Sequence, residues 1–166
     1  MVRIGNGAGG SVVHRPSEAR AIEVGSFGVS VLAEGEDTDS AFSLIETSEP
    51  QAGIGPPLHV HRDCAESFVI LAGAYRMFIE DVQIDCEPGS FIYVPRGTRH
   101  TFQNLVAGSR KLNLYTPAAM VGYFDALAAG IRAGLSDTEL DELAGRFAMD
   151  VVGPIPEHYL EGSGGV

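Results

Sequence analysis

Short apolar segments, separated by turn-forming residues, fill the middle of the chain and restrict it to a few folds. The segments alternate in polarity and are rich in Val, Ile, Phe and Tyr, which is typical of β-strands. Pairs such as Pro88-Gly89 mark the turns between them. Short strands with frequent turns indicate an all-β fold, an antiparallel sandwich or barrel. We expect strands at 21–24, 27–33, 41–47, 75–79, 82–86, 91–94, 98–104 and 110–115, with two more inside 56–73.

The hydrophobic period changes to a helical one after residue 115. Thr116 and Pro117 suit the N-cap and first position of a helix, which Gly134 would end. Ser136 and Glu139 have the spacing of a capping box that starts a second helix. We expect this helical pair to cover the β core or a partner subunit. The apolar stripes are Met120, Phe124, Leu127 and Ile131, and then Leu140, Leu143, Ala144 and Phe147.

A length of 166 residues is enough for one domain with a substantial core. We expect a flexible Gly-rich N-terminus at 1–10, a β-barrel domain at 11–116, a helical extension at 117–149 and a Pro/Gly-rich tail at 150–166. The glycines of the first segment match the pattern GxGxxG. A dinucleotide site needs a strand before that pattern and a helix after it, and neither is indicated here, so no nucleotide cofactor is expected.

The charge balance narrows the classes of partner. The formal net charge is −11, and such a surface repels phosphate backbones and anionic membranes. No apolar run approaches the ~20 residues of a membrane helix, and the N-terminus lacks the apolar core of a secretory signal. The two cysteines, Cys64 and Cys86, are too few for a disulfide scaffold. We therefore expect a cytoplasmic protein with a small-molecule substrate, and neither a nucleic-acid nor a membrane partner.

One stretch, 56–73, holds residues that can bind a metal ion. His59 and His61 are two positions apart in a strand-like segment, so their side chains share a face and their Cα atoms are roughly 6.6 Å apart. Two imidazoles can converge on one ion across that gap, and Glu66 could complete the set from the next strand. A His-x-His pair also arises by chance, so a second stretch has to support this interpretation. Cys64 could line the same site, although a loop or core position is the simpler interpretation.

The second stretch, 89–104, supplies His100 on a strand that follows a Pro-x-Gly turn. Together the two stretches resemble the two sequence motifs of the cupin superfamily, and every spacing of both motifs is met. The matching positions are Gly53, His59, His61, Glu66 and Gly73 in the first motif, and Gly89, Pro95, Gly97, His100 and Asn104 in the second.

This resemblance implies a double-stranded β-helix, or jelly-roll barrel, with two C-terminal α-helices. It implies that His59, His61, Glu66 and His100 bind one metal ion inside the barrel. The chain looks most similar to small single-domain cupins of the quercetin-dioxygenase type, in which Glu66 would also be the catalytic proton acceptor. The motif glycines and Pro95 would turn the strands, and Asn104 would bind backbone rather than substrate.

Three imidazoles and one carboxylate leave two octahedral positions open for water, substrate or O₂. This ligand set fits several divalent transition metals. Fe(II) is the cofactor we favour, and Mn, Ni, Co, Cu and Zn are alternatives. The expected function is a dioxygenase that acts on a small phenolic or enolisable compound, such as a diketone or flavonol. The alternatives are a non-oxidative isomerase, decarboxylase or lyase that uses the metal as a Lewis acid, and a metal-dependent small-molecule binding protein.

Strand parity identifies five candidates for substrate contact, although residues of this kind fill a barrel equally well. The resemblance also implies a homodimer, in which the edges of the β-sandwich would be covered. The candidate contacts are Phe68, Ile70, Met77, Tyr93 and Phe102.

Overall fold

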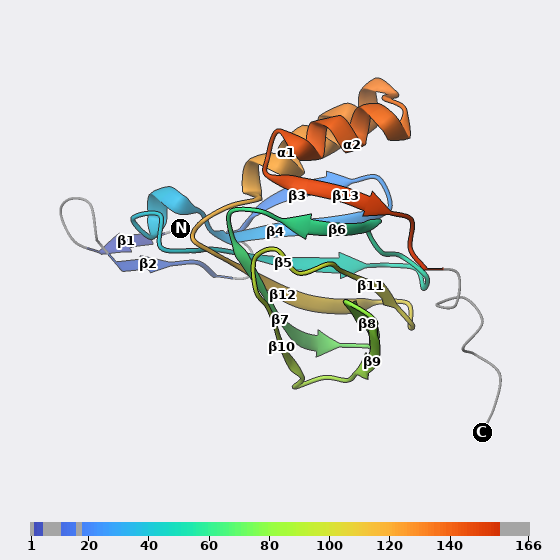
Figure 1. Ribbon diagram of the computed structural model, residues 1–166. Helices are drawn as coiled ribbons and strands as arrows, with labels where there is room; N and C mark the ends of the chain where they lie inside the picture. The colour runs from blue at the N-terminus through green and yellow to red at the C-terminus, as the bar shows by residue number, and fades with distance from the viewer. Residues whose placement is uncertain (1, 5–10, 16–17, 157–166) are drawn as a thin grey trace.

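Two antiparallel β-sheets face each other across the interior of the protein (Figure 1). The computed structural model describes residues 2–4, 11–15 and 18–156. The larger sheet has the order β10 (Phe91–Val94), β7 (Ala65–Ala72), β12 (Ser109–Thr116), β5 (Ser43–Glu49), β4 (Phe27–Ala33) and β3 (Arg20–Val24). The smaller sheet has the order β13 (Met149–Gly153), β6 (Leu58–His61), β11 (His100–Asn104), β8 (Tyr75–Ile79) and β9 (Val82–Cys86). The two sheets form the expected jelly-roll β-barrel.

The inner face of the larger sheet changes character along its width. On β3 and β4 the buried side chains are apolar and include Ile22 and Val29, and Ile45 of β5 packs with them. On β12 and the far half of β5, alternate buried side chains are polar or charged, and among them Lys111 is 0 % exposed. Charged groups at such depth require partners, so this half of the interior holds polar networks as well as packing contacts.

Two helices follow the barrel strands, α1 (Val121–Ala133) and α2 (Asp137–Gly145). The predicted end of the first helix and the capping box of the second are confirmed: Gly134 is a left-handed C-cap, and the Ser136 backbone N–H donates to Glu139 Oε2 at 2.8 Å. The predicted start at residue 117 is wrong. The backbone N–H groups of Ala118 and Ala119 instead donate to Ser40 O and Ser43 Oγ, so the segment before α1 is held by the loop ahead of β5 and by the first residue of that strand.

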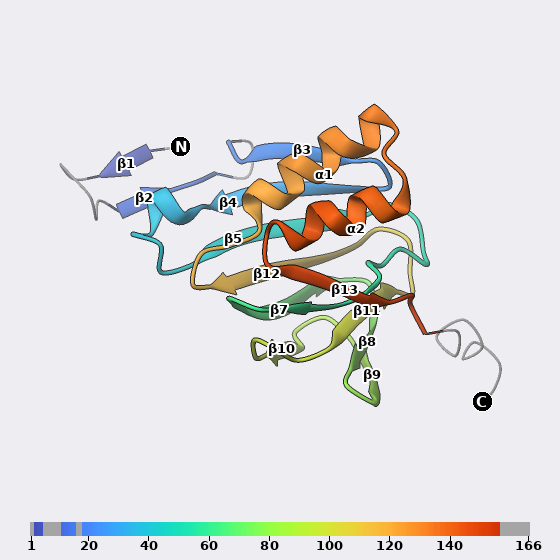
Figure 2. The same cartoon turned by 45° about the horizontal axis from the view of Figure 1, so that its top comes forward.

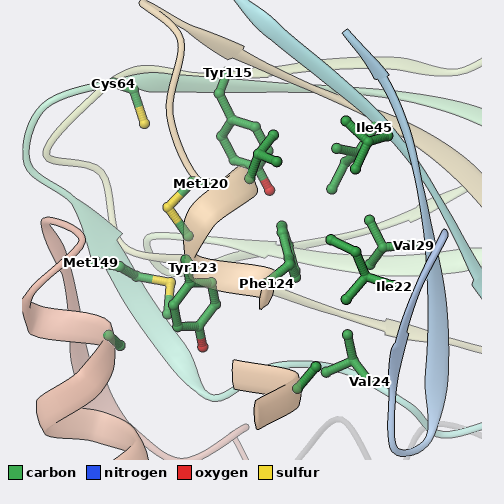
Figure 3. Packing of buried hydrophobic residues seen from close by; sticks show 14 residues of the cluster. Ile22, Val24, Val29, Ile45, Cys64, Tyr115, Met120, Tyr123, Phe124 and Met149 are labelled. Atoms are coloured by element: carbon green, nitrogen blue, oxygen red, sulfur yellow. The ribbon is translucent and has the colours of Figure 1, made fainter. Parts of the chain in front are cut away.

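The helices close one side of the barrel. Helix α1 packs on β3 and α2 packs on β13, and these strands are edges of the larger and smaller sheets (Figure 2). The helices therefore span the gap between the sheets. Figure 3 shows Phe124 near Val29 and Ile22 of the larger sheet, and Tyr123 near Met149 of β13, all within one buried cluster.

Two short segments differ from the expected domain boundaries. Strand β1 (Val2–Ile4) pairs with β2 (Ser11–Val13), where a flexible terminus was expected over 1–10, and residues 5–10 lie outside the described residues. Strand β13 begins at the end of the predicted helical extension and runs into the predicted tail. A 3₁₀ helix, η1 (Gly35–Asp37), lies in the loop between β4 and β5. Within the described part of the chain, no helix has the length and apolar character needed to cross a membrane.

The motif glycines have the turning role that the resemblance implied. Gly53, Gly73, Gly89 and Gly97 all have φ between 77° and 93°, in the left-handed region that residues with a Cβ avoid. Gly73 has a second constraint: a Cβ there would lie 2.0 Å from Ser109 Oγ and 2.8 Å from Ser109 Cα.

We predict that Gly73→Ala destabilises the protein more than Gly108→Ala. Gly108 has the same φ of 77°, but a Cβ added there would meet nothing within 4 Å, so it isolates the backbone cost of roughly 1–2 kcal/mol. Gly73→Ala adds the clash with Ser109 and is expected to cost about 3 kcal/mol or more. Urea unfolding of both variants measures the difference. Equal losses would show that the contact with Ser109 is relieved without cost.

Candidate metal centre

Three strands bring four potential metal ligands together inside the barrel. His59 and His61 alternate on β6, and His59 is paired in register with His100 on β11. Glu66 is on β7 of the opposite sheet. All four side chains are buried, and one ligand atom from each lies within 4.8 Å of the others. The spacing in the sequence therefore becomes a compact group that could hold one metal ion.

The carboxylate of Glu66 joins two of the imidazoles. Its Oε2 atom lies 3.0 Å from His61 Nε2 and 3.0 Å from His100 Nε2. The imidazole rings are also close to one another, with centroids 4.4 Å apart for His59 and His100 and 5.0 Å apart for His59 and His61. Three nitrogens and one carboxylate oxygen thus face a common centre.

Neighbouring groups orient the ligands. His59 Nδ1 is 2.8 Å from Pro57 O, and His100 Nδ1 is 3.0 Å from Thr98 O. Because a carbonyl can only accept, both Nδ1 atoms carry a proton, and in His59, whose Nε2 has no carboxylate partner, the Nε2 lone pair faces inward. Asn113 Nδ2 donates to Glu66 Oε1 at 2.9 Å and fixes the carboxylate from the other side.

The group retains unused bonding capacity. His61 Nδ1 and Asn113 Oδ1 are buried and have no hydrogen-bond partner among the described residues. Buried polar atoms without partners are uncommon and call for an explanation such as an ion or a water molecule. Together with the N₃O ligand set, this fits a divalent transition metal.

Burial and charge set the protonation states that a metal site needs. Burial, together with the neighbouring His100 and His61, lowers the pKa of His59 to about 3, so this imidazole is neutral near pH 7. Burial alone would raise the pKa of Glu66, but hydrogen bonds from His100 and His61 hold that pKa well below its ordinary value. Burial and the facing Glu66 raise the pKa of Tyr115 well above 10. A neutral imidazole and an ionised carboxylate are the forms that bind metal.

A cavity of about 790 Å³ adjoins this group. Its polar wall includes His59, His61, Glu66, Asn113 and Tyr115. A second wall comes mainly from α1, α2 and β13; it is largely apolar and also contains Asp137 and Asp141 of α2. That wall includes Met120, Tyr123, Phe124, Leu127, Leu140 and Met149. A cavity of this size accommodates a small organic molecule.

The structure places the five candidate contact residues differently. Phe102 lines the cavity. Phe68, Ile70 and Met77 do not, because they are 0–1 % exposed within a separate core cluster at the β8 side of the barrel. Tyr93 is 57 % exposed on the edge strand β10, outside the cavity. Phe68, Ile70 and Met77 do lie on inward faces, but parity does not give their height along the barrel, which decides contact with the cavity; Tyr93 lies on the exposed face of β10, opposite to that of the buried Val94.

Two further side chains have structural roles. Asn104 bonds backbone as predicted: its Oδ1 accepts from Ile54 N–H at 2.7 Å, and its Nδ2 donates to Gln51 O at 2.7 Å. Cys64 is a buried core residue, and burial raises the pKa of its thiol to about 12. It is not part of the cavity wall.

Several functional positions were missed from the sequence. Asn113 and Tyr115 contact Glu66 from β12, and the signal was available: Lys111, Asn113 and Tyr115 are alternate polar positions in an expected strand. The contribution of β13 had no such signal, because its residues follow a helix and precede a Pro-rich segment.

Comparisons with known proteins identify the fold class. Residues 44–111 match the family model of the cupin domain. No curated protein matches the sequence significantly. KdgF from Halomonas sp. is similar in structure, with a TM-score of 0.56 and 17 % identity over 62 % of this chain and 90 % of that one.

Two further structures share the fold. The polyketide cyclase RemF from Streptomyces resistomycificus has a TM-score of 0.54 and 24 % identity over 64 % of this chain and 78 % of its own. A predicted oxalate decarboxylase from Thermotoga maritima has a TM-score of 0.57 and 19 % identity, over 64 % of this chain and 99 % of its own. At sequence identities below 25 %, these similarities show a shared fold and nothing more.

We predict that His59→Ala and His100→Ala each lower metal affinity by at least about tenfold, because each removes one of four ligands. Metal analysis of protein purified without added metal would test this. His14→Ala is the matched control, because His14 lies after β2 and outside the group. An unchanged metal content in His59→Ala would refute the assignment.

The metal-free protein should lose stability as the pH falls below 6.5. Unfolded His59 takes up a proton near 6.5, whereas in the folded protein it does so near 3. The unfolded state therefore binds more protons in this window, and the free energy of unfolding falls with pH, by at most about 1.4 kcal/mol per pH unit for this residue. Urea unfolding of EDTA-treated protein from pH 7 to pH 4 measures the slope. His59→Gln should have a shallower slope, and an equal slope would contradict the assignment to His59.

Proposed function

We propose that this protein is a metal-dependent cupin enzyme, and specifically a dioxygenase that acts on a small phenolic or enolisable compound such as a diketone or flavonol. The observation that carries the proposal is the convergence of three buried imidazoles and one ionised carboxylate beside a cavity whose lining is largely apolar. A bound divalent ion, Fe(II) in this proposal, would supply redox and Lewis-acid chemistry at that point.

Residues around the four candidate ligands would orient Glu66 and contact such a substrate. Asn113 holds one oxygen of Glu66, and the hydroxyl group of Tyr115 faces the same carboxylate. In our proposal Glu66 accepts the proton that a phenol or enol loses when its oxygen binds. Phe124 and Leu127 from α1 form the apolar wall that contacts the substrate body and excludes water.

A second candidate is a non-oxidative reaction, an isomerisation, decarboxylation or lyase step in which the metal is a Lewis acid. A second buried carboxylate, Glu49, also lines the cavity, and a pair of buried carboxylates suits proton transfer without a change of oxidation state. The names of the similar structures, a polyketide cyclase and an oxalate decarboxylase, are compatible with this class.

Oxygen uptake separates these candidates. Fe(II)-loaded protein mixed with a panel of 1,3-diketones and flavonols should consume O₂ in step with loss of the substrate. Glu66→Gln should reduce this rate by about 100-fold or more, because it removes both a ligand charge and the proton acceptor. Turnover that persists under nitrogen would favour the non-oxidative reaction, and ligand-induced stabilisation without any product would favour a binding protein.

A further inference from the structure

A buried polar cluster lies beside the metal group and is not used by it. Lys111 Nζ donates to Glu49 Oε1 at 2.8 Å and to Thr47 Oγ1 at 2.6 Å, and the Tyr75 hydroxyl donates to Glu49 Oε2. Lys111 is 0 % exposed, and its Nζ lies 3.8 Å from the centre of the Phe102 ring. Thr47, Glu49 and Phe102 line the cavity, whereas Lys111 lies behind them.

The position of this cluster relative to the metal group follows from strand register. Asn113 holds Glu66, and Lys111 is the next inward position on β12, roughly 7 Å along the strand. Lys111 is directly opposite Thr47 on β5. Thr47 and Glu49 are therefore within reach of a substrate whose metal-binding oxygens lie at one end of an aromatic ring and whose further substituent lies at the other end.

The cluster presents one donor and one acceptor to the cavity. Thr47 Oγ1 accepts from Lys111, and among the described residues its own proton has no acceptor. Each oxygen of Glu49 accepts one hydrogen bond from the protein and can accept another, because a carboxylate oxygen has two lone pairs. A hydroxyl group, which donates and accepts at once, fits this pair.

The charges of the cluster favour a neutral group over an ion. Lys111 balances the charge of Glu49, so the pair as a whole is neutral. A ligand carboxylate would meet Glu49 at the cavity wall, while Lys111 is shielded behind Phe102. A buried ion pair is seldom more stable than an apolar replacement of the same volume, so packing alone gives no reason for charge at this position.

We propose that Thr47 and Glu49 form a second subsite that binds a neutral hydroxyl group of the substrate, with Lys111 as the positioning residue of Glu49. The inference deepens the proposed function and rests on it, because it takes the metal group to hold the other end of the substrate. It narrows the substrate class to compounds with a neutral hydroxyl group remote from the metal-binding oxygens.

Binding of matched probes to zinc-loaded protein tests this proposal. Zinc has no redox chemistry, so binding is measured without oxidation. The probes are 3-hydroxyflavone, whose only oxygen donors are at the metal-binding end and in the ring, and a set of its derivatives that each carry one additional hydroxyl group. The wild type should bind at least one derivative about tenfold or more tightly than the parent compound.

Substitutions test whether the tighter binding of the hydroxylated derivative depends on Thr47, Glu49 and Lys111. Thr47→Val removes the donor and should reduce the preference to about threefold or less, whereas Thr47→Ser keeps the hydroxyl group and should retain it. The double variant E49M/K111M removes both charges together and should abolish the preference. The preference is a ratio of two dissociation constants, so a general loss of packing does not mimic its loss. If the double variant does not fold, the comparison of Val with Ser at position 47 decides.

The outcomes separate this inference from the proposed reaction. A preference that persists in Thr47→Val and in E49M/K111M would overturn the subsite, as would a wild type that binds none of these probes. A preference that depends on Thr47 and Glu49, in a protein that consumes no O₂ when loaded with Fe(II), would support the subsite and refute only the dioxygenase reaction.

Discussion

The carboxylate of Glu66 is the contact on which the interior of this protein depends. It belongs to the larger sheet, yet its Oε2 is 3.0 Å from His61 and from His100 of the smaller sheet, while Asn113 holds Oε1. One buried charge thus connects the two sheets and defines the centre of the ligand group. Because an isolated buried carboxylate is costly, the strands around it have to supply partners, and these partners are the residues that can bind a metal.

The same requirement explains the polar half of the interior. Lys111, Asn113 and Tyr115 alternate inward along β12, beside Thr47 and Glu49 of β5. Each charged member has a partner of opposite charge or a hydrogen-bond donor, so charge is balanced locally. The apolar half, built on β3, β4 and α1, carries the hydrophobic packing instead. The cavity lies where these halves meet, and this position gives it one polar wall and one apolar wall.

Much of this arrangement was predictable from sequence because it rests on local patterns. Alternation located the strands from 20 to 116, and the resemblance of the His59, His61, Glu66 and His100 spacing, with the turning glycines, to the cupin motifs implied both the fold and the ligand group. Other features depended on contacts between distant segments. Phe68, Ile70 and Met77 lie on inward faces yet away from the cavity, and α1 begins late because the segment before it bonds to Ser40 and Ser43. No local pattern encodes either fact.

The candidate metal ligands and the apolar wall of the cavity come from different parts of the chain. The ligand group lies within the cupin-matching region 44–111, but β13 pairs with β6 so that Met149 is opposite His61 and Val151 is opposite His59. Arg62 reinforces this pairing through Asp150 and the carbonyl of Gly145. The segment after the cupin region therefore covers the free edge of the ligand strand and supplies most of the apolar cavity wall. Changes in α1, α2 and β13 can alter the shape of the cavity without moving a ligand, because His59, His61 and His100 are held by their own strand pairing and backbone contacts.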